Sequence, residues 1–215
     1  MRACLRTLNG VLNRCIRWTL MGLIRLAFRP KISYVSERAR QEAFRSPMIM
    51  VSNHVRGMDG AALCTLFPGK KIHGVSAKEF MDKPALGWLL RRLGCVSVDR
   101  DHVTVDWLRQ CRRILVKNQE HVYICPEGKC NFQKQMQPFK PGAVTLAYMA
   151  KVPLLPVYHN GEYHYFFGKR FRCMVGEPFL LHTREGTLDA AGIAAETKRL
   201  EQEMFRLRDL LEAKR

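Results

Sequence analysis

A histidine and an aspartate five residues apart could form the base and the orienting acid of a proton-transfer site. His54 follows a short apolar run, and Asp59 begins the next helical pattern. Side chains five residues apart on an ideal helix point about 140° away from each other, so the two meet only if the chain bends, which Gly57 makes feasible. Asp59 would then hold one imidazole nitrogen and leave the other free to accept a proton from a substrate hydroxyl. The same spacing also fits a structural histidine.

Three further segments combine an apolar strand with polar residues, glycine or proline. They are GCVSVDR at 94–100, ICPEGK at 124–129 and VPLLPV at 152–157. Taken singly, they also fit a surface ion pair, a tight turn and a core or edge strand. A fourth segment, FKPGA at 139–143, opens a helix whose N-terminal amides could meet an anion.

Strand and helix patterns alternate from residue 47 onward. This alternation predicts an α/β fold: a single domain with a mixed, largely parallel central sheet flanked by helices. No repeat, low-complexity tract or linker interrupts it. The expected strands are 48–52, 72–76, 95–98, 121–125, 153–158 and 171–176, and the expected helices are 59–66, 79–93, 103–118, 141–150 and 189–213.

Residues 4–28 predict an N-terminal amphipathic helix that ends before Pro30. Its apolar residues repeat every three or four positions, and Arg14, Arg17 and Arg25 lie away from that line. The longest clean apolar run, 18–24, is about one-third of a bilayer span, so no transmembrane helix is expected. Residues 1–30 therefore predict a helix in the interface of an anionic membrane, with a catalytic domain over 31–215. A helix packed on its own domain is the alternative. The apolar line comprises Leu5, Leu8, Leu12, Ile16, Leu20, Leu23 and Ala27.

Composition narrows the classes of protein that this chain can be. The 215 residues are 47% hydrophobic and 26% charged, which excludes a disordered, collagen-like or coiled-coil chain. The net charge of +17 favours an anionic partner: nucleic acid, a membrane or an acidic protein. Eight scattered cysteines with no C-x-x-C pair predict reduced thiols and no zinc site. No metal cluster or dinucleotide-binding glycine pattern is seen, so no bound cofactor is expected.

Together, the segments resemble the sequence blocks of the glycerolipid acyltransferase family, the bacterial 1-acyl-glycerol-3-phosphate acyltransferases and their lysophospholipid relatives. Those blocks read N-H-x-x-x-x-D, G-x-x-F-I-D-R, F-P-E-G-T-R and V-P-I-I-P-V. The resemblance covers about residues 48–157, with A-K-x-E-L-like and G-W-L-L stretches at 77–80 and 87–90. The first block is matched by Asn53, His54 and Asp59, and the third by Pro126, Glu127 and Gly128. The second is matched by Gly94, Asp99 and Arg100, with Ser97 at the position of the usual Phe. The fourth is matched by residues 152–157, with Leu154 and Leu155 in place of isoleucines.

The resemblance implies transfer of a fatty acyl group from a thioester of acyl-carrier protein or coenzyme A to a lysolipid hydroxyl. The first expected acceptor is 1-acyl-sn-glycerol-3-phosphate, which would give phosphatidic acid without an acyl-enzyme. His54 would be the general base and Asp59 its orienting acid. The enzyme would lie on the cytoplasmic face of the membrane as a peripheral protein. The substrate-binding residues would be Asn53, Lys78, Arg100, Glu127, Gly128 and Lys129.

The third block departs from the family pattern. Lys129 and Cys130 stand where the family has Thr-Arg, and Cys125 replaces the leading Phe. Lys129 offers a point charge without the bidentate fork of an arginine. Another lyso-phospholipid or a lyso-aminolipid therefore stays open as the acceptor. Two other classes also stay open: a lipid-binding relative without catalysis, and a nucleic-acid-binding module, which only the net charge favours because no recognition motif is present.

Overall fold

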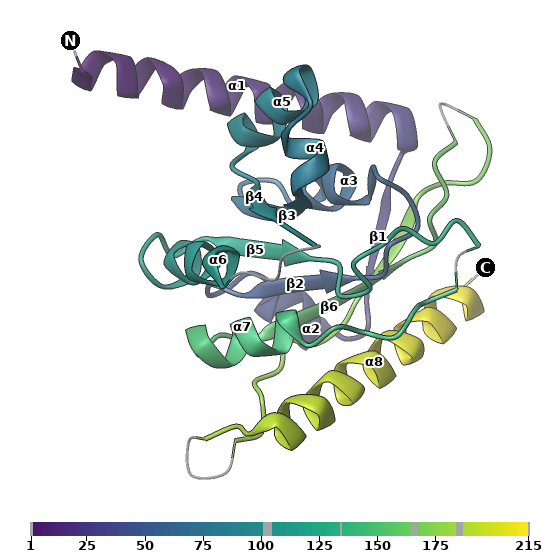
Figure 1. The fold of residues 1–215 in the computed structure, drawn as a ribbon. Helices are drawn as coiled ribbons and strands as arrows, with labels where there is room; N and C mark the ends of the chain where they lie inside the picture. The colour runs from purple at the N-terminus through teal and green to yellow at the C-terminus, as the bar shows by residue number, and fades with distance from the viewer. Residues whose placement is uncertain (1, 101–104, 134, 165–166, 184–186, 215) are drawn as a thin grey trace.

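One central sheet of seven strands forms within the described part of the chain, in the order β1-β7-β6-β2-β5-β3-β4 (Figure 1). The structure is a computed structural model that describes residues 2–100, 105–133, 135–164, 167–183 and 187–214. Neighbouring strands are parallel except β6 and β7, which are antiparallel. This confirms the expected mixed, largely parallel sheet. The strands are β1 (Lys31–Tyr34), β2 (Ile49–Ser52), β3 (Ile72–Ala77), β4 (Val96–Val98), β5 (His121–Ile124), β6 (Leu154–His159) and β7 (Arg172–Val175).

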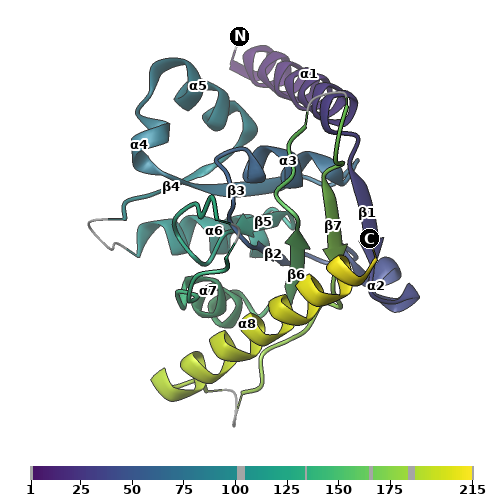
Figure 2. The same cartoon turned by 90° about the vertical axis from the view of Figure 1, so that its right-hand side faces the viewer.

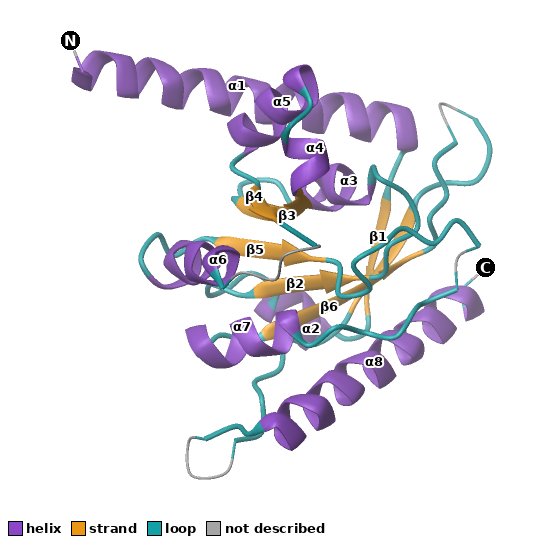
Figure 3. Ribbon diagram, in the orientation of Figure 1, coloured by secondary structure: helices purple, strands orange, loops and turns teal. Residues whose placement is uncertain are grey.

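Helices cover both faces of the sheet, so the molecule has three layers (Figures 1 and 2). Figure 3 shows the strands as the layer between them. One face carries α1 (Arg2–Phe28), α3 (Asp59–Leu66), α4 (Lys78–Met81) and α5 (Pro84–Leu93). The other carries α6 (Asp106–Val116), α7 (Gly142–Ala150) and α8 (Ala190–Ala213), while the short α2 (Glu37–Glu42) follows β1.

The observed elements follow the sequence patterns with three differences. The expected helix 79–93 is divided into α4 and α5, because Pro84 occupies the first turn of α5 and cannot continue a helix that enters from α4. Strand β1 and helix α2 were not predicted, since four and six residues are too few for a clear periodicity. The expected helix 103–118 begins at Asp106, and residues 103–104 of that prediction lie outside the described residues.

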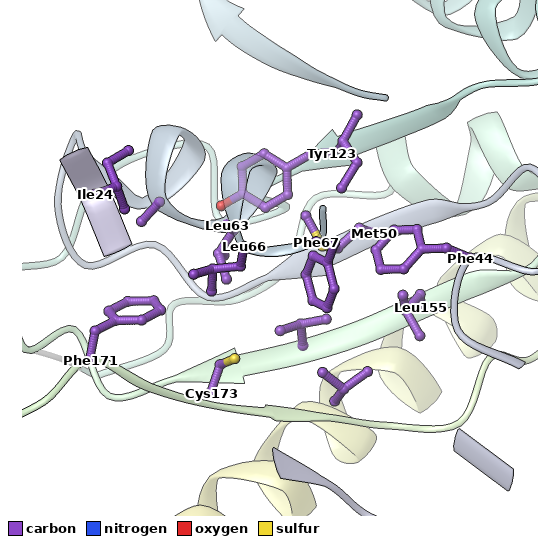
Figure 4. Packing of buried hydrophobic residues seen from close by; sticks show 14 of the residues in the cluster. Ile24, Phe44, Met50, Leu63, Leu66, Phe67, Tyr123, Leu155, Phe171 and Cys173 are labelled. Carbon is purple, nitrogen blue, oxygen red and sulfur yellow. The ribbon is translucent and has the colours of Figure 1, made fainter. Parts of the chain in front are cut away.

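Strand β2 supplies side chains to two cores, one on each side of the sheet. Met50 packs with Leu63 of α3 in the core that Figure 4 shows. Ile49 and Val51 point the other way and pack with Leu200 of α8. Because alternate residues of a strand face opposite sides, a strand covered on both sides is apolar throughout. The continuous run at 48–51 therefore marks β2 as a central strand.

Helix α1 packs onto this domain through one side. Ile24 and Phe28 are buried in the core that contains Met50, and Leu20 and Ala27 pack against it. Leu23, which the sequence placed on the same apolar line, is 59% exposed. The expected single apolar face is therefore divided, with one part in the core and one part at the surface.

Two arginines of α1 bind the ends of other helices. The Arg17 guanidinium donates to the carbonyl of Leu93, the last residue of α5. Arg25 Nη2 donates to the carbonyl of Leu66, the last residue of α3, at 2.8 Å. The last carbonyls of a helix lack partners within the helix and carry partial negative charge, so a guanidinium stabilises them. These arginines thus tie α1 to the domain, where the sequence alone indicated a polar face open to lipid headgroups.

Among the described helices, none combines the length and the apolar character needed to cross a bilayer.

The turn at Gly94 yields a stability prediction. Gly94 has φ 79°, and a Cβ there would lie 2.6 Å from His73 Nδ1. We expect Gly94→Ala to lower the free energy of unfolding by at least about 1 kcal/mol, because both the backbone and the contact oppose a side chain. Equilibrium urea denaturation measures this. Gly22→Ala is the matched control: Gly22 is a helical glycine of α1 with nothing near its Cβ position. The control should leave stability unchanged or raise it, and an equal loss in both variants would contradict the prediction.

Candidate active site

The polar sequence segments meet at one edge of the sheet. Strands β2, β5, β3 and β4 are mutually parallel, so their carboxyl ends lie on the same side. His54 follows β2, Glu127 follows β5 and Arg100 follows β4 within a few residues. The carboxyl edge of parallel strands is where α/β proteins commonly place their ligand sites. The topology therefore gathers residues that are up to 73 positions apart in the chain, such as His54 and Glu127.

His54 and Asp59 are in direct contact. His54 Nδ1 lies 2.9 Å from Asp59 Oδ2. The carboxylate is fully buried, whereas 21% of the imidazole side chain is exposed. An ionised carboxylate accepts hydrogen bonds only, so it selects the tautomer with hydrogen on Nδ1. Nε2 is then the nitrogen that can accept a proton.

The bend between the two residues is held by Asp59 itself. Its Oδ2 accepts the backbone N–H groups of Val55 at 2.6 Å and Arg56 at 2.8 Å. Its Oδ1 accepts the hydroxyl of Tyr163 at 2.5 Å. Gly57, expected to permit the bend, has an ordinary negative φ and open space around its Cβ position. The carboxylate therefore makes this turn, and the freedom of glycine is not required.

The surroundings of the pair favour its charged state. Burial opposes a charged imidazole, but the hydrogen bond that His54 donates to Asp59, and then Cys125 and Cys130, outweigh it and raise the pKa of His54 to about 11. Burial likewise works against the carboxylate, but the contact with His54 and the nearby charge of His159 hold the pKa of Asp59 below its ordinary value. The unliganded site thus stabilises an imidazolium beside a carboxylate.

Two buried side chains fix the backbone around His54. Glu127 Oε1 accepts the backbone N–H of His54 at 2.7 Å, and its Oε2 accepts that of Gln137 at 2.8 Å. Burial is the main reason why the pKa of Glu127 is raised. Asn53 binds the backbone of His159 through Nδ2 and Oδ1 at 3.0 and 2.9 Å, which joins the ends of β2 and β6. Asn53 and Glu127 therefore position His54, and a contact of either with a substrate stays a prediction.

The expected cations do not all lie at the site. Arg100 Nη1 donates to the carbonyl of Gly128 at 2.8 Å. Arg100 also lines a large cavity that His54 lines as well. Lys78 is 58% exposed and lies 3.5 Å from Asp99, outside the cavity lining. Lys129 is exposed and also outside that lining. Of the three cations that sequence assigned to an anionic group, only Arg100 is placed beside the cavity.

Cys130 is in contact with the imidazole of His54. Its Sγ lies 3.3 Å from His54 Nε2 and 3.8 Å from Nδ1. Burial raises the pKa of the Cys130 thiol, although the neighbouring His54 works in the opposite direction. The nitrogen that could accept a substrate proton therefore has a thiol as its present neighbour.

A cavity of about 1210 Å³ opens beside His54 and extends toward α1. This exceeds the range of roughly 300–1,000 Å³ that is usual for small-molecule sites. Its walls are mainly apolar and come from α1, α3, α5 and the neighbouring strands, with Leu20, Met21, Ala61, Leu89, Leu90 and Val98 among them. Such a cavity suits a long apolar group whose reactive end lies at the imidazole.

Sequence reasoning missed two residues of the site. Tyr163 lies in the loop after β6, outside every recognised segment, and no sequence signal links it to Asp59. Lys140 lines the cavity, and its Nζ lies 3.2 Å from the place where a Cβ on Gly128 would be. Lys140 belongs to the segment 139–143, which opens a helix and was expected to meet an anion. That expectation was the sequence feature that could have pointed to Lys140.

Fold and site together define an α/β protein with a hydrogen-bonded His–Asp pair beside a large apolar cavity. The chain belongs to the Acyltransferase family, whose sequence model matches residues 31–160, more than half of its length.

Relatives with acyltransferase names match part of the chain, and one solved structure shares its fold. Human 1-acyl-sn-glycerol-3-phosphate acyltransferase alpha is 26% identical to this chain over 61% of its length. The chloroplastic 1-acyl-sn-glycerol-3-phosphate acyltransferase BAT2 of Brassica napus is 32% identical over 52%. The 1-acyl-sn-glycerol-3-phosphate acyltransferase of Saccharomyces cerevisiae is 30% identical over 53%. The matches cover 47%, 32% and 38% of those proteins, so the chain spans about a third to a half of their length. The crystal structure of the 1-acyl-sn-glycerophosphate acyltransferase PlsC from Thermotoga maritima shares the fold, with TM-score 0.69 and 18% identity over 97% of this chain and 83% of that one.

The contact between His54 and Asp59 predicts an unusual titration. The ordinary pKa of histidine is 6.5, and the pKa of His54 is raised to about 11. The charged His54 therefore stabilises the folded state. This contribution is fully present below pH 6.5 and is lost as the pH rises through 11. We expect NMR of the imidazole nitrogens to show His54 still charged at about pH 8. In Asp59→Asn its pKa should fall to the ordinary value or lower, because the carboxylate is gone and burial remains. An unchanged titration in this variant would show that Asp59 is not the cause.

Proposed function

We propose that this protein transfers a fatty acyl group from an acyl thioester to the free hydroxyl of a lysolipid in phospholipid biosynthesis. The observation that carries the proposal is the His54 imidazole, held through Nδ1 by Asp59, at the mouth of the apolar cavity. The family assignment supports acyl transfer as the reaction class. The proposed catalytic domain is 31–215.

His54 is the general base of the proposed reaction. Its neutral Nε2 takes the proton of the acceptor hydroxyl while the oxygen attacks the thioester carbonyl, and Asp59 stabilises the imidazolium that forms. The C–S bond to the donor then breaks and its thiolate leaves. This route needs one base and no covalent bond to the protein. Because only the neutral imidazole accepts a proton, the raised pKa of His54 makes the reaction faster at higher pH.

The acceptor's anionic group is proposed to bind near Gly128. Arg100 donates to the Gly128 carbonyl, and the Lys140 ammonium lies beside the same residue. The names of the relatives support 1-acyl-sn-glycerol-3-phosphate as this acceptor, with phosphatidic acid as the product. Lys129 and Cys130 stand where the family pattern has Thr-Arg. The alternative acceptor is therefore a lyso-phospholipid with a larger headgroup or a lyso-aminolipid. Lys78 and Lys129 would add long-range attraction from the surface.

The apolar cavity is proposed to hold acyl chains. Its walls between α1, α3 and α5 offer apolar surface continuous with the imidazole. The donor is a thioester of acyl-carrier protein or coenzyme A. Both donors are anionic, and the net charge of +17 attracts either.

The outer side of α1 is proposed to rest in the interface of an anionic membrane. Since the inner side packs on the core, the residues available to lipid are those at the surface, and α5 adds an exposed tryptophan nearby. The enzyme would then lie peripherally on the cytoplasmic face and meet lysolipids without extracting them. Within residues 10–28 of α1, the exposed large apolar residues are Val11, Leu12, Trp18, Leu23 and Leu26.

Loss of the base should remove the activity. We expect His54→Ala to lower acyl transfer by at least about 10²–10⁴-fold, the range that a general base contributes. Purified wild type and variant are given acyl-carrier-protein or coenzyme A thioesters with a panel of lysolipids, and products are measured by mass spectrometry. His164→Ala, at an exposed histidine that pairs with Glu162, is the matched control and should retain activity.

Near-wild-type transfer by His54→Ala would refute the assignment of the base. If neither wild type nor variant acylates any lysolipid, a non-catalytic lipid-binding role becomes the better hypothesis.

Polar substitutions on the outer side of α1 should weaken membrane binding without unfolding the protein. The double variant Leu23→Ser, Leu26→Ser removes apolar area that is 59% and 64% exposed, so the core is left intact. We expect its binding to vesicles of mixed neutral and anionic phospholipid to fall at least about threefold, as buried apolar area drives such binding. Vesicle flotation measures the bound fraction. Leu180→Ser is the control: Leu180 is 62% exposed, lies between β7 and α8, and has its carbonyl bound by Arg199 of α8. Equal binding of the double variant and wild type would assign membrane contact to another surface.

A further inference from the structure

Cys130 contacts the catalytic nitrogen and has no part in the transfer described above. Its Sγ lies 3.3 Å from His54 Nε2 and 3.8 Å from Nδ1, and Asp59 Oδ2 lies 2.9 Å from Nδ1. Thiol, imidazole and carboxylate thus follow one another in contact. A base beside a thiol, oriented by a third group, is the arrangement that activates a cysteine nucleophile.

The other thiols of the cavity are placed differently. Cys64 and Cys95 also line the cavity, away from the contacts of His54, and burial raises the pKa of both thiols. Cys125 Sγ lies 2.8 Å from the hydroxyl of Tyr123. Cys130 is only partly buried and lines the cavity together with His54. A thioester whose chain lies in the cavity would therefore bring its carbonyl to the thiol that, among the described residues, lies 3.3 Å from His54 Nε2.

We propose that Cys130 is a second acyl acceptor of this site. Its thiol takes the acyl group from the donor thioester and forms an acyl-Cys130 thioester, which the lysolipid hydroxyl then discharges. The inference rests on the proposed function, because it uses the same donor, base and acceptor. It adds a second route for the acyl group beside direct transfer.

Both steps of this route balance without an oxidant or a further reactant. In the first, the Cys130 proton passes to His54 Nε2, the sulfur bonds to the carbonyl carbon, the C–S bond to the donor breaks, and the donor sulfur takes the proton. In the second, the acceptor hydroxyl gives its proton to His54, its oxygen bonds to the acyl carbon, and the Cys130 sulfur leaves and recovers the proton. One thioester replaces another in the first step, so the acyl group stays activated for the second.

The test uses the full chain and palmitoyl-coenzyme A without a lysolipid. Intact-protein mass spectrometry and peptide mapping locate the adduct, and neutral hydroxylamine should remove it because it is a thioester. We expect wild type to carry one acyl group on Cys130 and Cys130→Ser to carry none. Cys64→Ser and Cys95→Ser, the matched controls at other cavity thiols, should be labelled like wild type. His54→Ala should be labelled on the order of 10²-fold more slowly, because the thiol loses its base.

A chase separates this inference from the proposed function. Labelled wild type, freed of donor, is mixed with 1-acyl-sn-glycerol-3-phosphate or with the acceptor found in the lysolipid panel, and the acyl group should pass to the lipid. Absence of the adduct in wild type that turns over lysolipid would overturn the inference and leave the proposed function intact. Equal labelling of His54→Ala, labelling of Cys64 instead, or an adduct that the acceptor does not discharge would also overturn it. Neither adduct nor turnover with any acceptor would overturn both.

Discussion

The site depends on a carboxylate that is buried without any contact with water. Burying an ionised group costs several kcal/mol unless hydrogen bonds replace its hydration. Asp59, which is 0% exposed, accepts four of them, from His54, two backbone amides and Tyr163. These donors come from the end of β2, the turn before α3 and the loop after β6. Satisfying one charge therefore fixes the orientation of the imidazole, the shape of the turn and the placement of a distant loop.

A second buried carboxylate holds the other side of the same histidine. Glu127 accepts the backbone N–H of His54, so the turn after β5 is joined to the end of β2. The two carboxylates differ in environment: hydrogen bonds and charge lower the pKa of Asp59, while burial raises that of Glu127. The lowered pKa suits Asp59, which balances the charged imidazole of His54. Glu127 instead holds the backbone N–H groups of His54 and Gln137 in place. The parallel pairing of β2 and β5 brings both within reach of a single residue.

The third sequence block shows how substitution changes a site whose frame is retained. The turn at Glu127-Gly128 keeps its backbone contacts, yet Cys130 stands where the family pattern has arginine. A thiol cannot hold an anion as a guanidinium does, and the cations beside Gly128 are Arg100 and Lys140. The thiol instead contacts the histidine. This position thus carries a thiol where the family pattern has a guanidinium.

The sequence by itself determined the α/β class, the six strands from 48 to 176, the membership of His54 and Asp59 in one site, and the resemblance to acyltransferases. These follow from local patterns, because periodicity and short motifs are set by neighbouring residues. Only the tertiary structure decided which side of α1 faces the core, since helical periodicity shows an apolar line but not its partner. It also decided that Tyr163, Lys140 and Cys130 join the site while Lys78 and Lys129 lie outside it. Those contacts depend on strand order and loop path, which bring residues far apart in the chain to one edge and which no local pattern encodes.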